Sequence, residues 1–260
     1  MEMAMRGIDS LPEECVAHIL SLTSPRDACR SSTLSSFFRE AADSDQTWQK
    51  FLPSDYAEIV SRSVHAIEFS SMKDLFLKLS FTPLLIDGGR KTFSIDKHAN
   101  KKCYMLSTKE LSITWATNNL NWCRKTLLQS RFPESVELIM VSWLEIHGKI
   151  EARMLSSNTI YGAYLIFRLA DRAFGLETLP SDVIVEVGDY KTQGSVYLKL
   201  GKELDQREVC ERDDKWLEVE LGEFYNVGCK NEVKMWLREI KGEHLKGGLV
   251  VEGIEIRPKR

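Results

Sequence analysis

The chain has 260 residues, with 35 lysines and arginines against 38 aspartates and glutamates and a formal net charge of −3. The basic residues are dispersed, so nucleic acid is not expected as a partner. No apolar run is long enough to cross a bilayer, and residues 1–7 lack a secretory signal, so no membrane contact is expected. The six cysteines form no CxxC pair, which favours a cytoplasmic or nuclear protein.

A chain of this length tends to divide into two cores, and the N-terminal part reads as a small helical module. Ser10 with Glu13 forms a capping box, and Ser24 followed by Pro25 repeats the start signal of a helix. Helices are expected over Leu11 to Leu22, from Pro25 onward, across Leu34 to Ala42, and from Ser44 or Asp45 through Trp48 to Pro53.

The apolar positions of this module are too many for three or four free-standing helices. They form a band wider than the stripe of a surface helix, and a segment of about 45 residues is too short to bury them all. Part of this surface is therefore expected to meet another protein.

The order of features in this segment resembles an F-box, which docks substrate receptors onto the Skp-type adaptor of a cullin ubiquitin ligase. The resemblance runs from Leu11-Pro12 through Ser24-Pro25 and Phe37-Phe38 to Trp48, and we place the F-box at residues 8–55. It implies adaptor contacts by Leu11, Pro12, Ile19, Leu20, Pro25 and Trp48. The alternative is an ordinary helical cap whose apolar residues belong to the core of the next domain.

Residues 56–100 read as a connector. A short helix is expected over Met72 to Leu79, capped by Ser70 or Ser71, with extended pieces at Leu84 to Ile86 and Thr92 to Ile95. The sequence leaves open whether the connector packs against the second domain or lets it swing.

From Lys101 onward the apolar period changes to two, as in β-strands. Alternation is clear at residues 183–187, 196–200 and 217–221, and two runs that are apolar on both faces, Glu137 to Ile146 and Tyr161 to Leu169, are expected as central strands. Glu232 to Ile240 fits a strand or a helix equally well. The predicted fold is a small all-α module followed by an all-β antiparallel sandwich.

This second part, residues 101–259, resembles the phloem protein 2 family, the plant lectin domain also called Nictaba-like. The resemblance rests on Lys101 to Ser107, Leu111 to Trp115, Val141 to Ile150, Leu221 to Phe224 and Gly248 to Lys259. It implies a jelly-roll-like sandwich and, in some members, binding of chitin oligomers or N-glycans.

Two tryptophans flank an asparagine-rich loop in this part, Trp115 to Trp122. Pyranose rings pack their C–H face on aromatic rings and pair their hydroxyls with amides or carboxylates. The resemblance gives Trp115 and Trp122 a sugar-binding role, with Asn118 and Asn119 as hydroxyl partners. It also implies a carboxylate near the final hairpin, either Glu239 or Glu243. Trp115 fits a core position equally well, because it shares a strand face with Leu111 and Ile113.

The remaining polar and aromatic candidates favour ordinary packing or solvation. His147 is expected to be exposed at a strand end, and Arg207 to Lys215 to form a solvated loop. Trp143 is expected in the core, and Trp216 and Trp236 are expected to serve packing rather than function. No zinc pattern, nucleophile elbow or phosphate loop occurs, so no cofactor, metal or catalysis is expected.

The predicted function is a substrate-recognition subunit of a cullin-type ubiquitin ligase, with adaptor and cullin core as partners and a glycan or glycoprotein as target. The alternative is a receptor whose sandwich recognises a protein surface without binding sugar.

Overall fold

The computed structural model describes residues 11–199, 209–228 and 230–259. Its N-terminal module has four helices, α1 (Glu13–Ser21), α2 (Pro25–Ser31), α3 (Ser36–Asp43) and α4 (Asp45–Phe51). The hydroxyls of Ser24, Ser35 and Ser44 each accept a backbone N–H in the first turn of the helix that follows. Helix α1 begins after Pro12, which provides no side-chain cap, and the expected cap Ser10 lies outside the described residues.

The connector is folded and packed. It contains α5 (Tyr56–Ser61), α6 (Met72–Phe81), β1 (Leu84–Ile86), a 3₁₀ turn (Asp87–Gly89) and β2 (Lys91–Ile95). The hydroxyl of Ser71 caps α6, as expected. Strand β2 pairs with β1 on one side and with the first sandwich strand on the other, so this segment continues the sandwich sheet.

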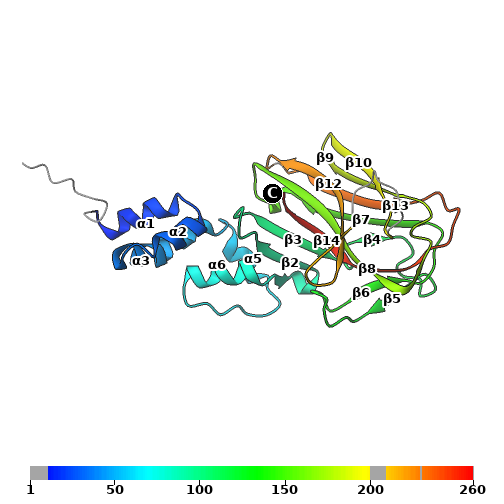
Figure 1. Ribbon diagram of the computed structural model, residues 1–260, viewed down its shortest axis with the longest axis horizontal. Coiled ribbons are helices and arrows are strands. Elements are labelled where there is room, and N and C mark those ends of the chain that lie inside the picture. The colour runs from blue at the N-terminus through cyan, green and yellow to red at the C-terminus, as the bar shows by residue number, and fades with distance from the viewer. Residues whose placement is uncertain (1–10, 200–208, 229, 260) are drawn as a thin grey trace, which may run out of the picture.

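Two antiparallel sheets form the rest of the molecule (Figure 1). The nine-stranded sheet has the order β1-β2-β3-β14-β8-β12-β11, with β6 on β14 and β5 on β6. Its further strands are β3 (Lys102–Ser107), β5 (Trp122–Lys125), β6 (Ser135–Leu138), β8 (Thr159–Phe174), β11 (Cys210–Glu211), β12 (Leu217–Asn226) and β14 (Gly247–Pro258). The five-stranded sheet has the order β10-β9-β13-β7-β4. Its strands are β4 (Ser112–Ile113), β7 (Leu144–Glu151), β9 (Ser181–Val187), β10 (Tyr190–Val196) and β13 (Glu232–Glu239). The predicted fold, a helical module followed by an antiparallel sandwich, is confirmed.

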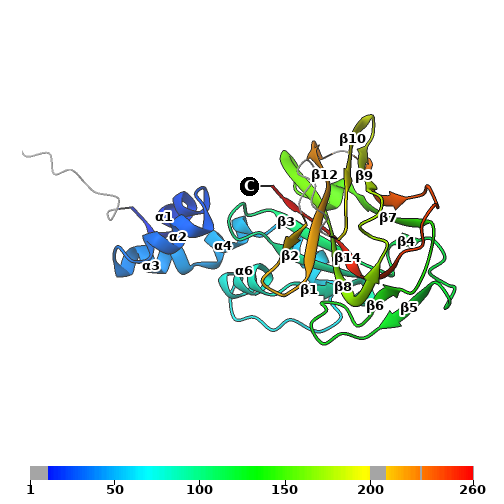
Figure 2. The ribbon, with the colours of Figure 1, turned by 45° about the vertical axis from the view of Figure 1, so that its right-hand side comes forward.

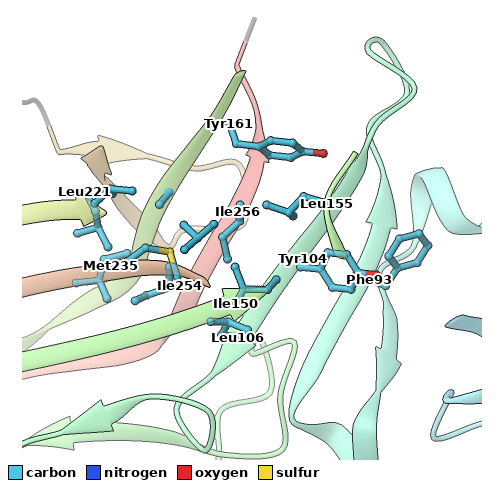
Figure 3. Packing of buried hydrophobic residues seen from close by; sticks show 14 of the residues in the cluster. Phe93, Tyr104, Leu106, Ile150, Leu155, Tyr161, Leu221, Met235, Ile254 and Ile256 are labelled. Carbon is cyan, nitrogen blue, oxygen red and sulfur yellow. The ribbon is translucent and has the colours of Figure 1, made fainter. Parts of the chain in front are cut away.

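Alternating apolar side chains of both sheets fill the space between them (Figure 3). Leu106, Ile254 and Ile256 of the nine-stranded sheet meet Ile150 and Met235 of the five-stranded sheet, and all five are at most 3% exposed. The core therefore fixes the strands whose ends carry the loops described below.

The same core extends into the helical module. The Trp48 ring lies 5.5 Å from that of Phe51 and 5.2 Å from that of Phe76 in α6. An ion pair of 3.0 Å joins Asp55, at the start of α5, to the buried Lys102 of β3. The helical module is thus attached to the sandwich through packed side chains as well as through the chain.

Three expectations about strands are settled. Glu137 to Ile146 is not one strand, because β6 ends at Leu138 in one sheet and β7 begins at Leu144 in the other. Residues 139–143 carry the chain between the sheets. Glu232 to Glu239 is a strand, with Val233, Met235 and Leu237 facing the core. Strand β10 ends at Val196, so the alternation expected through residue 200 stops early, and residue 200 itself lies outside the described residues.

Candidate functional site

Three loops meet at the end of the sandwich that lies away from α1–α3, near β4, β5 and β6 (Figures 1 and 2). They are residues 114–121, 139–143 and 240–246. The Asn121 side chain donates to the Met140 carbonyl at 2.9 Å, which joins the first loop to the second. Val141 and Lys246 exchange two backbone hydrogen bonds of 2.8 and 3.0 Å, which join the second loop to the third. We call this set of loops the loop end.

Trp115 lies on the surface of the loop end. Its side chain is 47% exposed, so the core position considered for it is wrong. Its φ of 59° is in the left-handed region, which a bulky residue rarely adopts and which is enriched at ligand sites. The neighbouring Ala116 packs inward instead, so the backbone turn at Trp115 directs the ring away from the core.

Trp122, at the other end of the same loop, is 2% exposed. Its indole N–H donates to the Thr114 carbonyl at 3.0 Å, and this bond joins the two ends of the loop on its buried side. Asn118 and Asn119 are both exposed between the two tryptophans. The carboxamide oxygen of Asn118 accepts the Leu120 amide at 3.0 Å, so this side chain shapes its own turn. The burial of Trp122 disfavours the direct sugar contact predicted for it.

The two candidate carboxylates differ in exposure, as the two tryptophans do. Glu239 is 3% exposed and forms an ion pair with Lys246, which is itself 2% exposed. The Lys246 ammonium also donates to the Ser142 carbonyl at 2.7 Å and to the His244 carbonyl at 3.1 Å. Glu243 is exposed in the third loop. Glu239 therefore supports two of the three loops through Lys246, and Glu243 is the carboxylate that solvent reaches.

Trp143 is not in the core, contrary to expectation, because its side chain is 40% exposed in the second loop. The sequence carried a signal for this: in an alternating pattern Trp143 falls on the same side as the polar Glu145 and opposite Leu144, which is the buried first residue of β7. His147 is also not simply exposed, since its ring stacks on that of Trp236 at 4.6 Å. Burial in this stack lowers the pKa of His147.

The solvated loop expected over Arg207 to Lys215 has one exception among its described residues: Cys210, Glu211 and Asp213 to Lys215 are exposed, but Arg212 is partly buried. Arg212 is 16% exposed and lies in a charged cleft on the outer side of the nine-stranded sheet, where its guanidinium contacts Glu218 at 2.8 Å. Glu255 accepts hydrogen bonds from Arg131, Arg212 and Arg257. Burial opposes ionisation of Glu255, but the three guanidinium groups outweigh it and lower its pKa to about 2. Trp216, which packs beside this network, is fully buried as expected.

At the opposite end of the molecule, α1 presents an exposed apolar stripe. Cys15, Ile19 and Leu22 recur at intervals of four and three residues, as side chains on one helix face do. Leu11 and Pro12 extend the stripe beyond the N-terminus of α1 and are exposed too. Ile19 is 44% exposed and Leu22 74% exposed. The other side of α1 packs on α3 through Val16, Ala17 and Leu20.

Within the described part of the chain, no cluster of three or more His, Cys, Asp or Glu side chains is arranged to hold a metal ion. Over the same residues, none of the helices has the length and apolar content needed to span a membrane.

The comparisons with known proteins match both parts of the chain. A family model described as Phloem protein 2 matches residues 101–258, and one described as F-box-like matches residues 8–54. The chain is similar to F-box protein PP2-B15 of Arabidopsis thaliana, with 45% identity over 96% of each chain. This chain is an F-box protein of the phloem protein 2 family. F-box protein VBF of the same plant is 42% identical, with 96% of this chain and 99% of that protein covered. A solved xylan-binding domain from Paenibacillus barcinonensis aligns over 58% of this chain and 87% of its own at 12% identity with a TM-score of 0.30, too weak a likeness to bear on function.

The six F-box residues named from the sequence divide into two groups. Leu11, Pro12 and Ile19 are exposed on the α1 side of the F-box. Leu20, Pro25 and Trp48 are buried, and the Trp48 indole N–H donates to the Ala42 carbonyl. Only the exposed group is available to another protein in this conformation.

Proposed function

We propose that this F-box protein is the substrate-recognition subunit of an SCF-type ubiquitin ligase. In this proposal the F-box docks on a Skp-type adaptor that links it to the cullin core, and the phloem protein 2 domain binds a glycan on the target. The chain itself recognises and does not catalyse. Such a ligase works in the cytosol or nucleus, which agrees with the absence of CxxC pairs among its cysteines.

The observation that carries the proposal is the chemical difference between the two ends of the molecule. The α1 stripe is aliphatic and aligned along one helix, as expected for a surface that packs against another helical protein. The loop end combines the exposed ring of Trp115 with the exposed amides of Asn118 and Asn119 and the carboxylate of Glu243. Aromatic rings with convergent polar groups suit a sugar, which has an apolar ring face and a rim of hydroxyls.

The domain boundaries follow from the same proposal. We assign the F-box to residues 8–55, the connector to residues 56–100 and the lectin domain to residues 101–259. The pairing of β2 with β3 supports a connector that moves with the lectin domain. The two ends then keep a fixed separation in the assembled ligase.

The adaptor half is tested by co-purification. A Leu11→Ala, Pro12→Ala variant removes two exposed apolar side chains of the F-box, and adaptor recovery is expected to fall at unchanged melting temperature. Leu128→Ala is the matched control, because Leu128 is fully exposed on the lectin domain and lies on neither end surface. Equal adaptor recovery by the double variant and the control would contradict the proposal.

The target half is tested on a glycan array with the full chain bound to its adaptor. Selective binding to a glycan class is expected, and Trp115→Ala is expected to abolish it. One observation favours the alternative that the loop end recognises a protein: Leu120, Met140 and Leu245 are 79%, 46% and 53% exposed there. A silent array, together with target capture that free sugar does not compete, would select that alternative.

A further inference from the structure

The loop end contains a second half-exposed tryptophan that the resemblance did not single out. Trp143 is 40% exposed, whereas Trp122, which the family motif pairs with Trp115, is 2% exposed. A buried indole has no face to offer a sugar ring. If the loop end binds a glycan, as proposed above, its second aromatic surface has to come from another residue.

Backbone pairing brings Trp143 close to Trp115. Ser112 pairs with His147 and Ile113 with Ile146, and the Thr114 amide donates to the Glu145 carbonyl at 3.1 Å. Trp115 is the next residue after Thr114, and Trp143 is two residues before Glu145. Trp115 follows the end of β4 by two residues, and Trp143 directly precedes the start of β7. Because β4 and β7 are antiparallel partners, the two tryptophans lie at the same end of this strand pair.

The backbone that carries Trp143 is held firmly. The buried ammonium of Lys246 donates to the carbonyl of Ser142 at 2.7 Å, directly before Trp143. Lys246 is fixed in turn by its ion pair with Glu239, and its backbone pairs with Val141. Leu144, directly after Trp143, is 1% exposed in the core. A half-exposed tryptophan between two anchored residues is a preorganised surface, which lowers the entropic cost of binding a ligand.

Polar groups lie beside this surface in the pattern a sugar needs. Glu145, the second residue of β7, is partly exposed and lies two residues after Trp143. Its carboxylate can accept hydrogen bonds from hydroxyls, as the amides of Asn118 and Asn119 can on the side of Trp115. Two separate rings, each with its own polar neighbours, provide for two pyranose units rather than one.

We propose that Trp143 is the second aromatic platform of the glycan site. Trp115 receives one pyranose ring and Trp143 the next. Trp122 and Glu239 are buried positioning residues. Trp122 holds the loop of Trp115 through its hydrogen bond to Thr114, and Glu239 holds the loop of Trp143 through Lys246. This inference rests on the proposed glycan-binding function and adds a contact residue to its site.

The test compares a monosaccharide with its trisaccharide on the adaptor-bound full chain. The probes are N-acetylglucosamine with chitotriose and mannose with mannotriose, measured by ligand-observed NMR and calorimetry. The wild-type protein is expected to bind one trisaccharide at least tenfold more tightly than its monosaccharide. Trp143→Ala is expected to remove this gain, and Trp143→Tyr to restore most of it.

Tyr190→Ala is the matched control, because Tyr190 is 50% exposed on β10, at the far edge of the same sheet. Melting temperatures show that each variant is folded. Full trisaccharide binding by folded Trp143→Ala overturns this inference and leaves the glycan-binding function standing. Failure of the wild-type protein to bind any of the four probes, together with a silent glycan array, overturns both.

Discussion

The two ends of the molecule use exposed apolar side chains in different ways. At the F-box end they are mostly aliphatic and repeat along one helix, and the exposed residues between them are Glu13, Glu14 and His18. At the loop end they include the rings of Trp115 and Trp143, and amides and carboxylates lie among them. Both surfaces rest on a buried second layer, Leu20 under α1 and Trp122 under the loops. Exposure alone therefore does not distinguish a protein-docking surface from a sugar-docking surface. The residue types and the polar groups around them do.

The largest expected effect comes from the buried layer of the loop end. Trp122→Ala removes a buried aromatic side chain and its hydrogen bond to Thr114, so the free energy of unfolding is expected to fall by about 4 kcal/mol. Trp115→Ala, seven residues earlier and on the surface, is expected to change it by less than about 0.5 kcal/mol. Chemical denaturation of both variants checks this. Equal losses of stability would break the division into a surface and a supporting layer.

The charged cleft on the outer side of the nine-stranded sheet differs from both ends of the molecule, because its charged side chains pair with one another. The pKa of Glu255 is lowered to about 2 against an ordinary value of 4.5. A lowered carboxyl pKa stabilises the fold above about pH 4.5, and this stability is lost as the pH falls toward 2. The expected contribution is about 3 kcal/mol.

The Glu255 prediction is measured by unfolding the wild-type protein and Glu255→Gln between pH 7 and pH 2. The variant is expected to be less stable at pH 7, because Arg131, Arg212 and Arg257 each lose one carboxylate partner. Its free energy of unfolding is also expected to depend less on pH below 4.5. Identical pH profiles of the two proteins would show that Glu255 is not the carboxylate that titrates.

At the F-box end two adjacent residues provide a matched pair. Ile19 is 44% exposed and Leu20 is 5% exposed. Ile19→Ala is expected to weaken adaptor binding about tenfold at unchanged stability, as for an apolar contact at the interface. Leu20→Ala is expected to lower the free energy of unfolding by about 2 kcal/mol and to affect binding only through the folded fraction. Calorimetry measures adaptor binding and thermal unfolding of both variants. A stability loss in Ile19→Ala together with a binding loss in folded Leu20→Ala would contradict the prediction.

Local signals predicted much of the fold. Serine caps at Ser24 and Ser44 marked the starts of α2 and α4, and strict alternation marked β9 and β12. The crossing at residues 139–143 was missed because Ile139, Met140 and Val141 continue the apolar run without a turn residue. Its position depends on the pairing of Val141 with Lys246, more than 100 residues later in the chain.

The candidate sites were harder to predict, because burial depends on contacts that are distant in the sequence. Trp115 and Trp122 are alike in a motif, and only the folded chain separates the exposed ring from the buried one. Arg212 sits in a run of charges that reads as solvated, until Glu255 of a strand remote in sequence comes beside it. The resemblance supplied the correct segments, but it could not divide contact residues from supporting residues.

The smallest expected effect separates the two glutamates of the loop end. Glu243→Gln keeps the shape of an exposed side chain and removes its charge, so glycan affinity is expected to fall only about threefold, less than 1 kcal/mol. Glu239→Gln, in contrast, removes the charged partner of the buried Lys246. It is expected to lower the free energy of unfolding and to leave the glycan affinity of the folded variant largely unchanged. Titration of the best array glycan into both folded variants checks this. If Glu239→Gln instead lost much of its glycan affinity at an unchanged melting temperature, Glu239 would be the carboxylate that contacts the sugar. The binding surface would then lie closer to the core than the exposed rings of Trp115 and Trp143 indicate.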